Sequence, residues 1–334
     1  MKSKVEQLIN DEFNGVVLVK KEGVKRFEQA FGYRDIPNEI ANQFDTKFAT
    51  ASAGKVFVAV GILQLVEQGK LKLTDTIGQL LAIDWKQINP NITVEQLLTH
   101  TSGIPDYFDE AVMDDYADLW KELPNYKIRT SMDLLPLFIN KEMAYAPGEK
   151  FKYNNTGFVV LGLIIEAIEK VSFDVYLQGA VFNLVGMEDT GYYELDRLPR
   201  NCANNYIWDE DNEVFYTNIF SVDVKGTGAG GAFTTASDIE KFWENLFSGK
   251  LLTQETITGM MSIQASDDED NYGYGIWLTD TQDNNPQPYF EGFDPGVSFF
   301  SFYDRKTNLM MVAISNTGDD VWNMGSNIKK EMSK

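Results

Sequence analysis

The combination of residues best suited to chemistry in this chain is a serine followed three positions later by a lysine, in Ser52-Ala53-Gly54-Lys55. Positions three apart lie on the same face of a helix, so the lysine amine can approach the serine hydroxyl. A serine becomes a good nucleophile only when a base takes its proton, and a lysine can be that base only if burial or nearby positive charge lowers its pKa. Free backbone N–H groups at a helix start could also stabilise an oxyanion. The alternative interpretation is an N-capping serine beside a surface lysine.

Other common catalytic and metal-binding patterns are missing from the sequence. His100 is the only histidine and Cys202 the only cysteine, whereas zinc sites generally need several such ligands. There is no P-loop and no dinucleotide-binding fingerprint, so we expect neither a metal nor a cofactor. A Ser-His-Asp triad could use only His100, for example with Asp106, and Ser52 lacks a Gly-x-Ser-x-Gly setting. We expect a structural His100 and an unreactive Cys202.

Composition and charge limit the classes of partner. The chain has 334 residues, 43% of them hydrophobic, which allows one large domain or two ordinary ones. A formal net charge of −21 argues against nucleic acid and anionic membrane surfaces. The acidic clusters Asp209–Asp211 and Asp267–Asp270 do not have the spacing of a calcium loop, and they are interpreted as solvated loops. Apolar runs such as Gly157–Ile165 are too short for a membrane anchor.

The first residues of the chain bear on its compartment. Residues 1–12 predict an amphipathic helix and lack the apolar core of a signal peptide. The single cysteine rules out an intramolecular disulfide. Both features favour a cytoplasmic protein, although a chain trimmed of its leader would look the same.

Strand patterns lie at both ends of the chain, with helical patterns between them. The expected strands are short β-branched or aromatic runs bounded by turn residues, at Gly15–Lys20, Arg26–Tyr33, Gly273–Leu278, Val297–Tyr303 and Leu309–Ser315. The expected helices cover about 52–68, a capped turn from Thr93, a run from Thr156, Ile239–Phe247 and a last helix from near Asp320.

This order predicts an α+β fold in which the terminal segments share one antiparallel sheet flanked by helices. We expect residues 1–80 and 220–334 to form the sheet part and residues 81–219 to form a mainly helical insertion. The active site should lie at the junction of the two parts, since clefts favour such boundaries.

Longer strings around the Ser52–Lys55 pair carry a family resemblance. They are Lys47–Lys55, Gly61–Leu71, Leu97–Pro105, Tyr145–Gly157, Leu161–Glu166, Gly186–Thr190, Gly230-Gly231, Thr235–Asp238 and Pro295-Gly296. In this order they resemble the class C β-lactamases and low-molecular-weight penicillin-binding proteins, over nearly the whole chain. The resemblance implies a β-lactamase/transpeptidase-like fold and a serine hydrolase with Ser52 as nucleophile and Lys55 as its proton-handling partner.

The family's Tyr-x-Asn motif falls on Tyr153-Asn154-Asn155. The resemblance implies that Tyr153 shares proton transfer with Lys55 and that Asn155 binds a substrate carbonyl or amide. A phenol titrates at about 10, so Tyr153 could act as a base only beside positive charge, which Lys55 could provide. The alternative is a buried core tyrosine.

The third motif departs from the family pattern. The usual Lys-Thr-Gly or His-x-Gly is replaced by Phe290-Glu291-Gly292, shortly before Pro295-Gly296. Gly292 would still let the strand lie against the substrate, and the N–H of Phe293 could complete an oxyanion hole with that of Ser52. Phe290 takes the place of the residue that helps bind a carboxylate in the family, so recognition of carboxylates should weaken.

Together these features predict a hydrolase that forms an acyl-enzyme on Ser52 and acts on a small ester, an amide or a D-amino acyl peptide. Binding of β-lactams is left open, and Phe290 shifts the expectation from β-lactamase toward esterase, amidase or peptidase. The alternative is a catalytically weakened, penicillin-binding-like protein with a binding or regulatory role.

Overall fold

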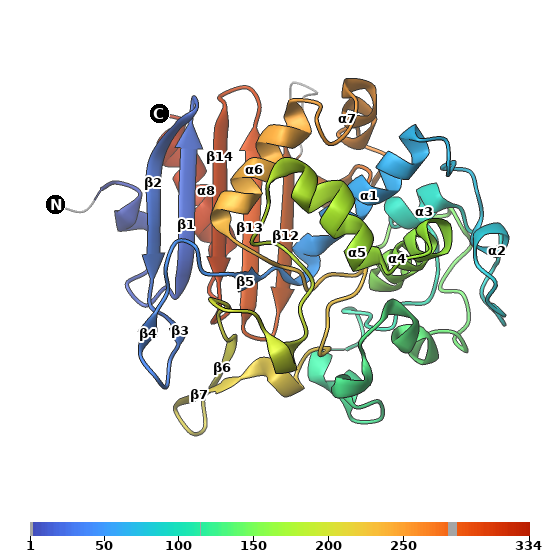
Figure 1. The fold of residues 1–334 in the computed structure, drawn as a ribbon, viewed down its shortest axis with the longest axis horizontal. Coiled ribbons are helices and arrows are strands. Elements are labelled where there is room, and N and C mark those ends of the chain that lie inside the picture. The colour runs from blue at the N-terminus through green and yellow to red at the C-terminus, as the bar shows by residue number, and fades with distance from the viewer. Residues whose placement is uncertain (1–2, 114, 280–285) are drawn as a thin grey trace.

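The computed structural model describes residues 3–113, 115–279 and 286–334. Its centre is an eight-stranded antiparallel sheet in the order β2-β1-β14-β13-β12-β11-β10-β9 (Figure 1). The strands are β1 (Gly15–Lys21), β2 (Val24–Phe31), β9 (Ala265–Ser266), β10 (Asn271–Tyr272), β11 (Trp277–Leu278), β12 (Pro288–Asp294), β13 (Val297–Asp304) and β14 (Leu309–Ser315). The α+β class expected from the sequence is therefore confirmed.

Strands from the first and last parts of the chain pair inside this sheet, next to its β2 edge. Strand β1 pairs with β14 so that Gly15 lies opposite Ser315 and Lys21 opposite Leu309. All of β14 and the apolar part of β1 are buried, because helices cover both faces of the sheet here. This double burial explains why both strands are continuous β-branched and apolar runs rather than alternating patterns.

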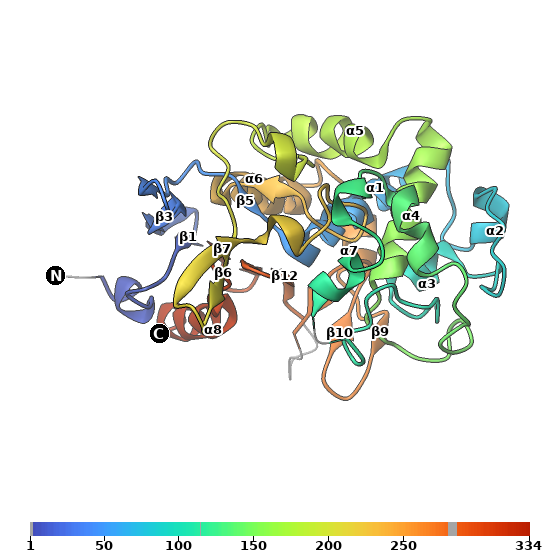
Figure 2. The ribbon, with the colours of Figure 1, turned by 90° about the horizontal axis from the view of Figure 1, so that it is seen from below.

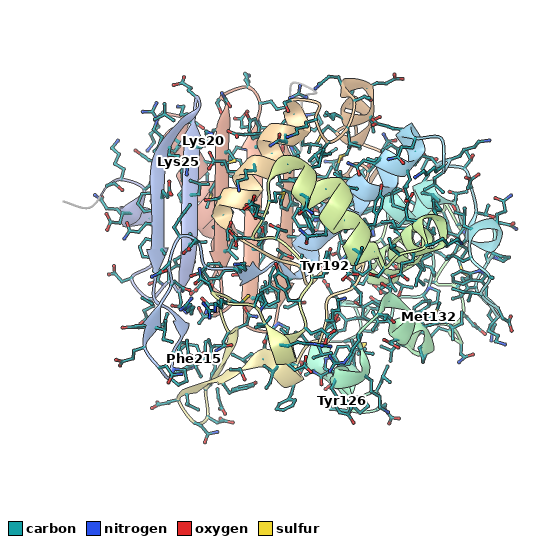
Figure 3. All side chains as sticks on the ribbon, in the orientation of Figure 1. Lys20, Lys25, Tyr126, Met132, Tyr192 and Phe215 are labelled. Carbon is teal, nitrogen blue, oxygen red and sulfur yellow. The ribbon has the colours of Figure 1, made fainter. Side chains whose placement is uncertain are left out.

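Helices α6 (Ala236–Phe247) and α8 (Val321–Met332) lie on opposite faces of the sheet (Figure 2). Figure 3 labels two lysines of the hairpin, Lys20 on β1 and Lys25 on β2. Both form ion pairs with Glu240 of α6, at 2.7 and 3.4 Å. On the other face, α8 packs with the N-terminal segment, where residues 3–12 form only the 3₁₀ turn η1 (Glu6–Leu8). The prediction of an amphipathic α-helix at the N-terminus is therefore wrong.

The remaining helices gather beside the β9–β12 end of the sheet (Figure 1). They are α1 (Lys55–Glu67), α2 (Ile77–Leu80), α3 (Val94–Leu98), α4 (Asn155–Glu169), α5 (Phe173–Leu177) and α7 (Gln254–Met260). One continuous core joins them to the sheet, since Leu18 and Val312 belong to the same buried cluster as Leu97 and Phe158. The division into residues 1–80 with 220–334 and residues 81–219 stays a prediction. Among the described helices, none is long and apolar enough to cross a membrane.

Shorter elements link these layers. They are β3 (Tyr33–Asp35), β4 (Ile40–Ala41), β5 (Phe48–Ala49), β6 (Tyr206–Asp209), β7 (Val214–Thr217) and β8 (Phe233–Thr234), with 3₁₀ turns η2 (Ala51–Gly54), η3 (Tyr116–Trp120), η4 (Asn125–Lys127), η5 (Ser131–Leu137), η7 (Asn183–Val185), η8 (Leu195–Arg197) and η9 (Asn218–Phe220), and a π turn η6 (Gln178–Phe182). The helix expected at about 52–68 therefore starts as η2 and becomes α-helical only at Lys55.

Candidate active site

Ser52 lies in the 3₁₀ turn η2, directly before the buried helix α1. The preceding residue, Ala51, has a φ of +46°, a left-handed conformation that is costly for a residue with a side chain. The backbone of Gly230 presses against this turn so closely that a Cβ on Gly230 would come 2.3 Å from the Ala51 carbonyl oxygen. The surrounding chain therefore holds Ser52 in one fixed position.

Lys55 lies one turn further on, and its amine is directed at the serine. Its Nζ donates to Ser52 Oγ at 2.9 Å, to Asn155 Oδ1 at 2.8 Å and to the carbonyl oxygen of Ala229 at 2.6 Å. The side chain is almost completely buried, and this burial lowers the pKa of Lys55 to about 8 even though Asp106 and other carboxylates favour the charged form. An amine with this pKa is neutral in a substantial fraction of molecules near neutral pH.

Tyr153 completes a triangle with these two residues. Its phenol shares a side-chain hydrogen bond with Ser52, and Lys55 Nζ lies 4.9 Å from its ring centre. The ring stacks on Trp277 at 5.6 Å and contacts His100 at 4.6 Å. Burial raises the pKa of Tyr153 well above its usual value, so the phenol stays protonated. The environment therefore favours the neutral phenol over a phenolate that could act as a base.

Asn155 and the start of α4 are held by a buried carboxylate. Asp106 accepts hydrogen bonds from the backbone N–H groups of Asn155 and Thr156, at 2.8 and 3.1 Å. The side-chain amide of Asn155 donates to the Phe108 carbonyl at 3.3 Å, which turns its oxygen toward Lys55. Burial raises the pKa of Asp106 to about 6. Asp106 thus positions the Tyr-x-Asn segment by capping the helix that follows it.

Strand β12 closes the other side of the site. A Cβ on Gly292 would lie 2.7 Å from Ser52 N and 2.3 Å from the carbonyl oxygen of Thr50, so only glycine allows this approach. Phe293 follows with its side chain 60% exposed at the cleft. Phe290 is 3% exposed and packs on Phe242 of α6 at 5.8 Å, behind the strand. The substrate-binding roles of Phe290, Gly292 and Phe293 stay predictions. Because Phe290 is buried behind the strand, it could affect substrate binding only through the packing of the core.

His100 does not form a serine–histidine–aspartate arrangement. Its Nδ1 accepts the backbone N–H of Asn154 at 3.1 Å, and its Nε2 has no hydrogen-bond partner among the described residues. Burial holds the pKa of His100 well below its usual value, so the ring is neutral. Asp106, its suggested partner, binds the start of α4 instead. These contacts agree with the structural role expected for His100.

The cleft beside Ser52 has a volume of about 640 Å³. Tyr107, Tyr116, Tyr153, Trp277 and Trp322 give it an aromatic wall, and its polar lining is acidic, with Glu110, Asp115, Asp223, Asp270, Glu291 and Asp294. Sequence analysis missed this gathering of acids, because the residues are scattered along the chain and none belongs to a motif. It also assigned Asp270 wholly to a solvated loop, whereas Asp270 is half-buried at the cleft. The described residues include no group of three or more His, Cys, Asp or Glu side chains placed to hold a metal ion.

Ser52, Lys55, Tyr153 and Asn155, which the sequence singled out, are therefore brought together, and Gly292 lies against them. The Beta-lactamase family model matches residues 2–329. The chain belongs to the Beta-lactamase family. Among solved structures it is similar to a penicillin-binding protein from Bacillus halodurans, with 37% identity, a TM-score of 0.93 and coverage of 98% of this chain and 99% of that one.

Other relatives show lower sequence identity to this chain. Penicillin-binding protein 4* of Bacillus subtilis is 26% identical over 92% of this chain and 69% of its own length. Protein flp of Staphylococcus aureus is 25% identical over 91% of this chain, which spans only 59% of the flp length. D-amino acid amidase from Ochrobactrum anthropi shares the fold, with a TM-score of 0.78 at 22% identity over 98% of each chain.

Proposed function

We propose that this member of the Beta-lactamase family is a serine hydrolase that forms an acyl-enzyme on Ser52. The observation that carries the proposal is the 2.9 Å contact between Lys55 Nζ and Ser52 Oγ, made by a buried amine whose pKa is lowered to about 8. A protonated Lys55 fills all three acceptors around it. The neutral amine can keep Asn155 Oδ1 and the Ala229 carbonyl and accept the serine proton with its lone pair.

Acylation follows from these positions. Ser52 Oγ attacks a substrate carbonyl as its proton passes to Lys55, and the oxyanion that forms is stabilised by the N–H groups of Ser52 and Phe293. Each such donor contributes roughly 10²–10³ in rate. As the bond to the leaving group breaks, Tyr153 donates its proton to the leaving atom and recovers one from Lys55. The net result is that Ser52 loses one proton and the released alcohol or amine gains one, while Lys55 and Tyr153 return to their starting states.

Hydrolysis of the acyl-enzyme uses the same groups in reverse. Water attacks the acyl carbon, its proton passes through Tyr153 and Lys55, and Ser52 leaves as the protonated alcohol. The aromatic walls and the volume of about 640 Å³ suit a small ester, an amide or a short peptide. These features support ester or amide hydrolysis as the proposed reaction class.

The nucleophile is tested by Ser52→Ala with p-nitrophenyl acetate and a fluorescent alkyl phosphonate. We expect the substitution to abolish both ester turnover and covalent labelling. Ser248→Ala, at the exposed end of α6, is the matched control and should keep both. Ester hydrolysis at the wild-type rate in Ser52→Ala would refute the assignment.

A binding or regulatory protein with little turnover is the second candidate. It is favoured by one observation, the phenylalanine that stands at position 290 in place of the family's lysine or histidine. A folded wild-type chain that forms no phosphonate or penicillin adduct at Ser52 would support this candidate over the hydrolase.

A further inference from the structure

The charges of the cleft are strongly one-sided. Among the described residues that line it, six carry carboxyl groups and none carries a lysine, arginine or histidine side chain. Lys55, whose charge acts on both Asp223 and Asp294, is buried beneath Ser52 and already has three hydrogen-bond acceptors. A carboxylate on the substrate would meet repulsion, whereas a cationic group would be attracted.

Two of these carboxyls, Asp223 and Asp294, lie close enough together that the charge of Asp223 acts on Asp294. Asp294 ends β12 two residues beyond Gly292, and Asp223 follows the turn η9. Burial raises the pKa of Asp294 to about 8 and that of Asp223 to about 6, and the charge of Asp223 adds to the effect on Asp294. Asp223 accepts the Tyr116 hydroxyl at 3.3 Å, while no hydrogen bond reaches the Asp294 carboxyl among the described residues.

A third acceptor lies behind this pair. Asn205 is 4% exposed, and its Oδ1 has no hydrogen-bond partner in the described part of the chain. It lines a cavity of about 30 Å³ whose wall also includes Asp223 and Asp294. A buried acceptor without a donor is costly. Its presence beside two carboxyls whose charged forms are disfavoured by burial therefore suits a ligand that supplies hydrogen-bond donors.

We propose that Asp223, Asp294 and Asn205 Oδ1 bind a substrate ammonium group, so that the preferred acyl donors are amino-acyl amides and esters. This inference rests on the proposed hydrolase function and narrows its substrate class. An ammonium carries three N–H donors, which match in number the three acceptors that line this one small cavity, and its charge offsets the repulsion between the carboxyls. Two residues of strand separate Asp294 from Gly292, which is a span of about 7 Å, so the ammonium lies a few bonds from the reacting carbonyl.

The substrate preference is tested with two anilides that differ only in charge at one position. Alanine p-nitroanilide, in both enantiomers, carries an ammonium where isobutyryl p-nitroanilide carries a methyl group. We expect kcat/KM for the better enantiomer to exceed that for the isobutyryl compound by about tenfold or more, as charge-assisted hydrogen bonds imply. A ratio near one would overturn the proposal.

Alanyl compounds could also react faster because they are intrinsically more reactive. Variants of the proposed ammonium site distinguish that explanation from binding of the ammonium by the protein. Asp294→Asn and Asp223→Asn should each lower the alanyl-to-isobutyryl ratio by about tenfold, the effect of losing one charged hydrogen bond. Asp209→Asn removes an equal charge from the exposed end of β6 and should leave the ratio unchanged. A ratio that stays at the wild-type value in both cleft variants would overturn the proposal.

Binding can also be measured without turnover. Isopropylammonium chloride should raise the thermal midpoint of Ser52→Ala more than sodium chloride at equal ionic strength, and the gain should disappear when Asp294→Asn is added. Equal midpoints in the two salts would refute the ammonium site. The two proposals fail in different experiments. If the hydrolase proposal is wrong, the phosphonate will not label Ser52 of the wild-type protein. The shift of the thermal midpoint by isopropylammonium tests the ammonium site independently of that result.

Discussion

Lys55 shows how one side chain can be fully hydrogen-bonded and still be suited to the role of base that we propose for it. The charged amine donates hydrogen bonds to three acceptors. The neutral amine still has two hydrogens, which can be donated to Asn155 Oδ1 and to the Ala229 carbonyl. Burial lowers its pKa while the carboxylates of Asp106 and Asp294 oppose that effect, and the balance is a pKa of about 8. Lys55 therefore changes protonation state close to physiological pH.

This balance predicts the pH dependence of the reaction. The active form of Lys55 is the neutral amine, whose fraction increases as pH rises through about 8, so kcat/KM for p-nitrophenyl acetate should rise through that range. Because Asp294 favours the charged amine, Asp294→Asn should move the rising limb to lower pH. Initial rates from pH 5 to pH 10, corrected for spontaneous hydrolysis, measure both effects. A profile that is flat across this range would contradict Lys55 as the base.

At the scale of single residues, sequence analysis could predict proximity where the residues are close in the chain. The spacing of Ser52 and Lys55 allows their contact, and the family resemblance pointed to Tyr153 and Asn155 through a contiguous motif. Asp223 and Asp294 could not be predicted, because their proximity depends on tertiary folding and neither lies in a recognisable pattern. The neutral state of Tyr153 was equally inaccessible, since it depends on burial by neighbours such as Trp277.

Among the elements, β12 depends on a single glycine for its position beside Ser52. Its glycine lets the strand lie against the 3₁₀ turn η2, and any side chain there would strike backbone atoms of Thr50 and Ser52. Backbone atoms cannot move aside as the end of a flexible side chain can. The distance between the strand and the nucleophile is thus set by the absence of a Cβ.

Gly292→Ala should therefore lower kcat by at least about 10²-fold, the effect of losing one oxyanion donor. The expected cause is displacement of β12 from Ser52, and the measurement is p-nitrophenyl acetate turnover with a thermal melt to confirm folding. Gly179→Ala is the matched control, because a Cβ there meets no atom within 4 Å. Unchanged kcat in Gly292→Ala would show that the close approach is not needed for catalysis.

Element boundaries show which sequence signals were reliable. Strand β14 was predicted with its observed bounds, because it is a continuous apolar run between turn residues. The N-terminal helix was wrong for a physical reason: Val5, Ile9 and Phe13 recur at helical spacing, but they are buried against α8 and the sheet from an irregular segment. Periodicity reports burial, and burial does not require a helix. Strand β12 gave little strand signal, since glycine and acidic residues interrupt it.

For the whole molecule, composition indicated which partners to exclude but not where the charge lies. A net charge of −21 argued against nucleic acid, and the acidity seemed dispersed along the sequence. Folding gathers six carboxyl groups around the cleft that holds the nucleophile. The electrostatic potential at the reacting carbonyl is therefore a property of the fold rather than of any motif.

This potential predicts how the protein treats penicillins. Benzylpenicillin carries a carboxylate that the acidic cleft repels, so its acylation of Ser52 should be slower than that by benzylpenicillin methyl ester, by about tenfold or more on the scale of one charge interaction. Competition of each compound with the fluorescent phosphonate, followed by intact-protein mass spectrometry, measures the two rates. Faster acylation by the free acid would show that a carboxylate-binding group operates despite the charges.

The pairing of β1 with β14 has a consequence for biosynthesis. On its inner side Gly15 pairs with Ser315, so this edge of the first hairpin has no neighbour until about 300 further residues have been synthesised, as the difference between positions 315 and 15 gives. At typical translation rates of about 5–20 residues per second, that delay lasts on the order of tens of seconds. During this interval the apolar edge of β1 is open to other nascent chains. Yield in the cell should then depend on chaperone capacity and translation speed as much as on the stability of the finished fold.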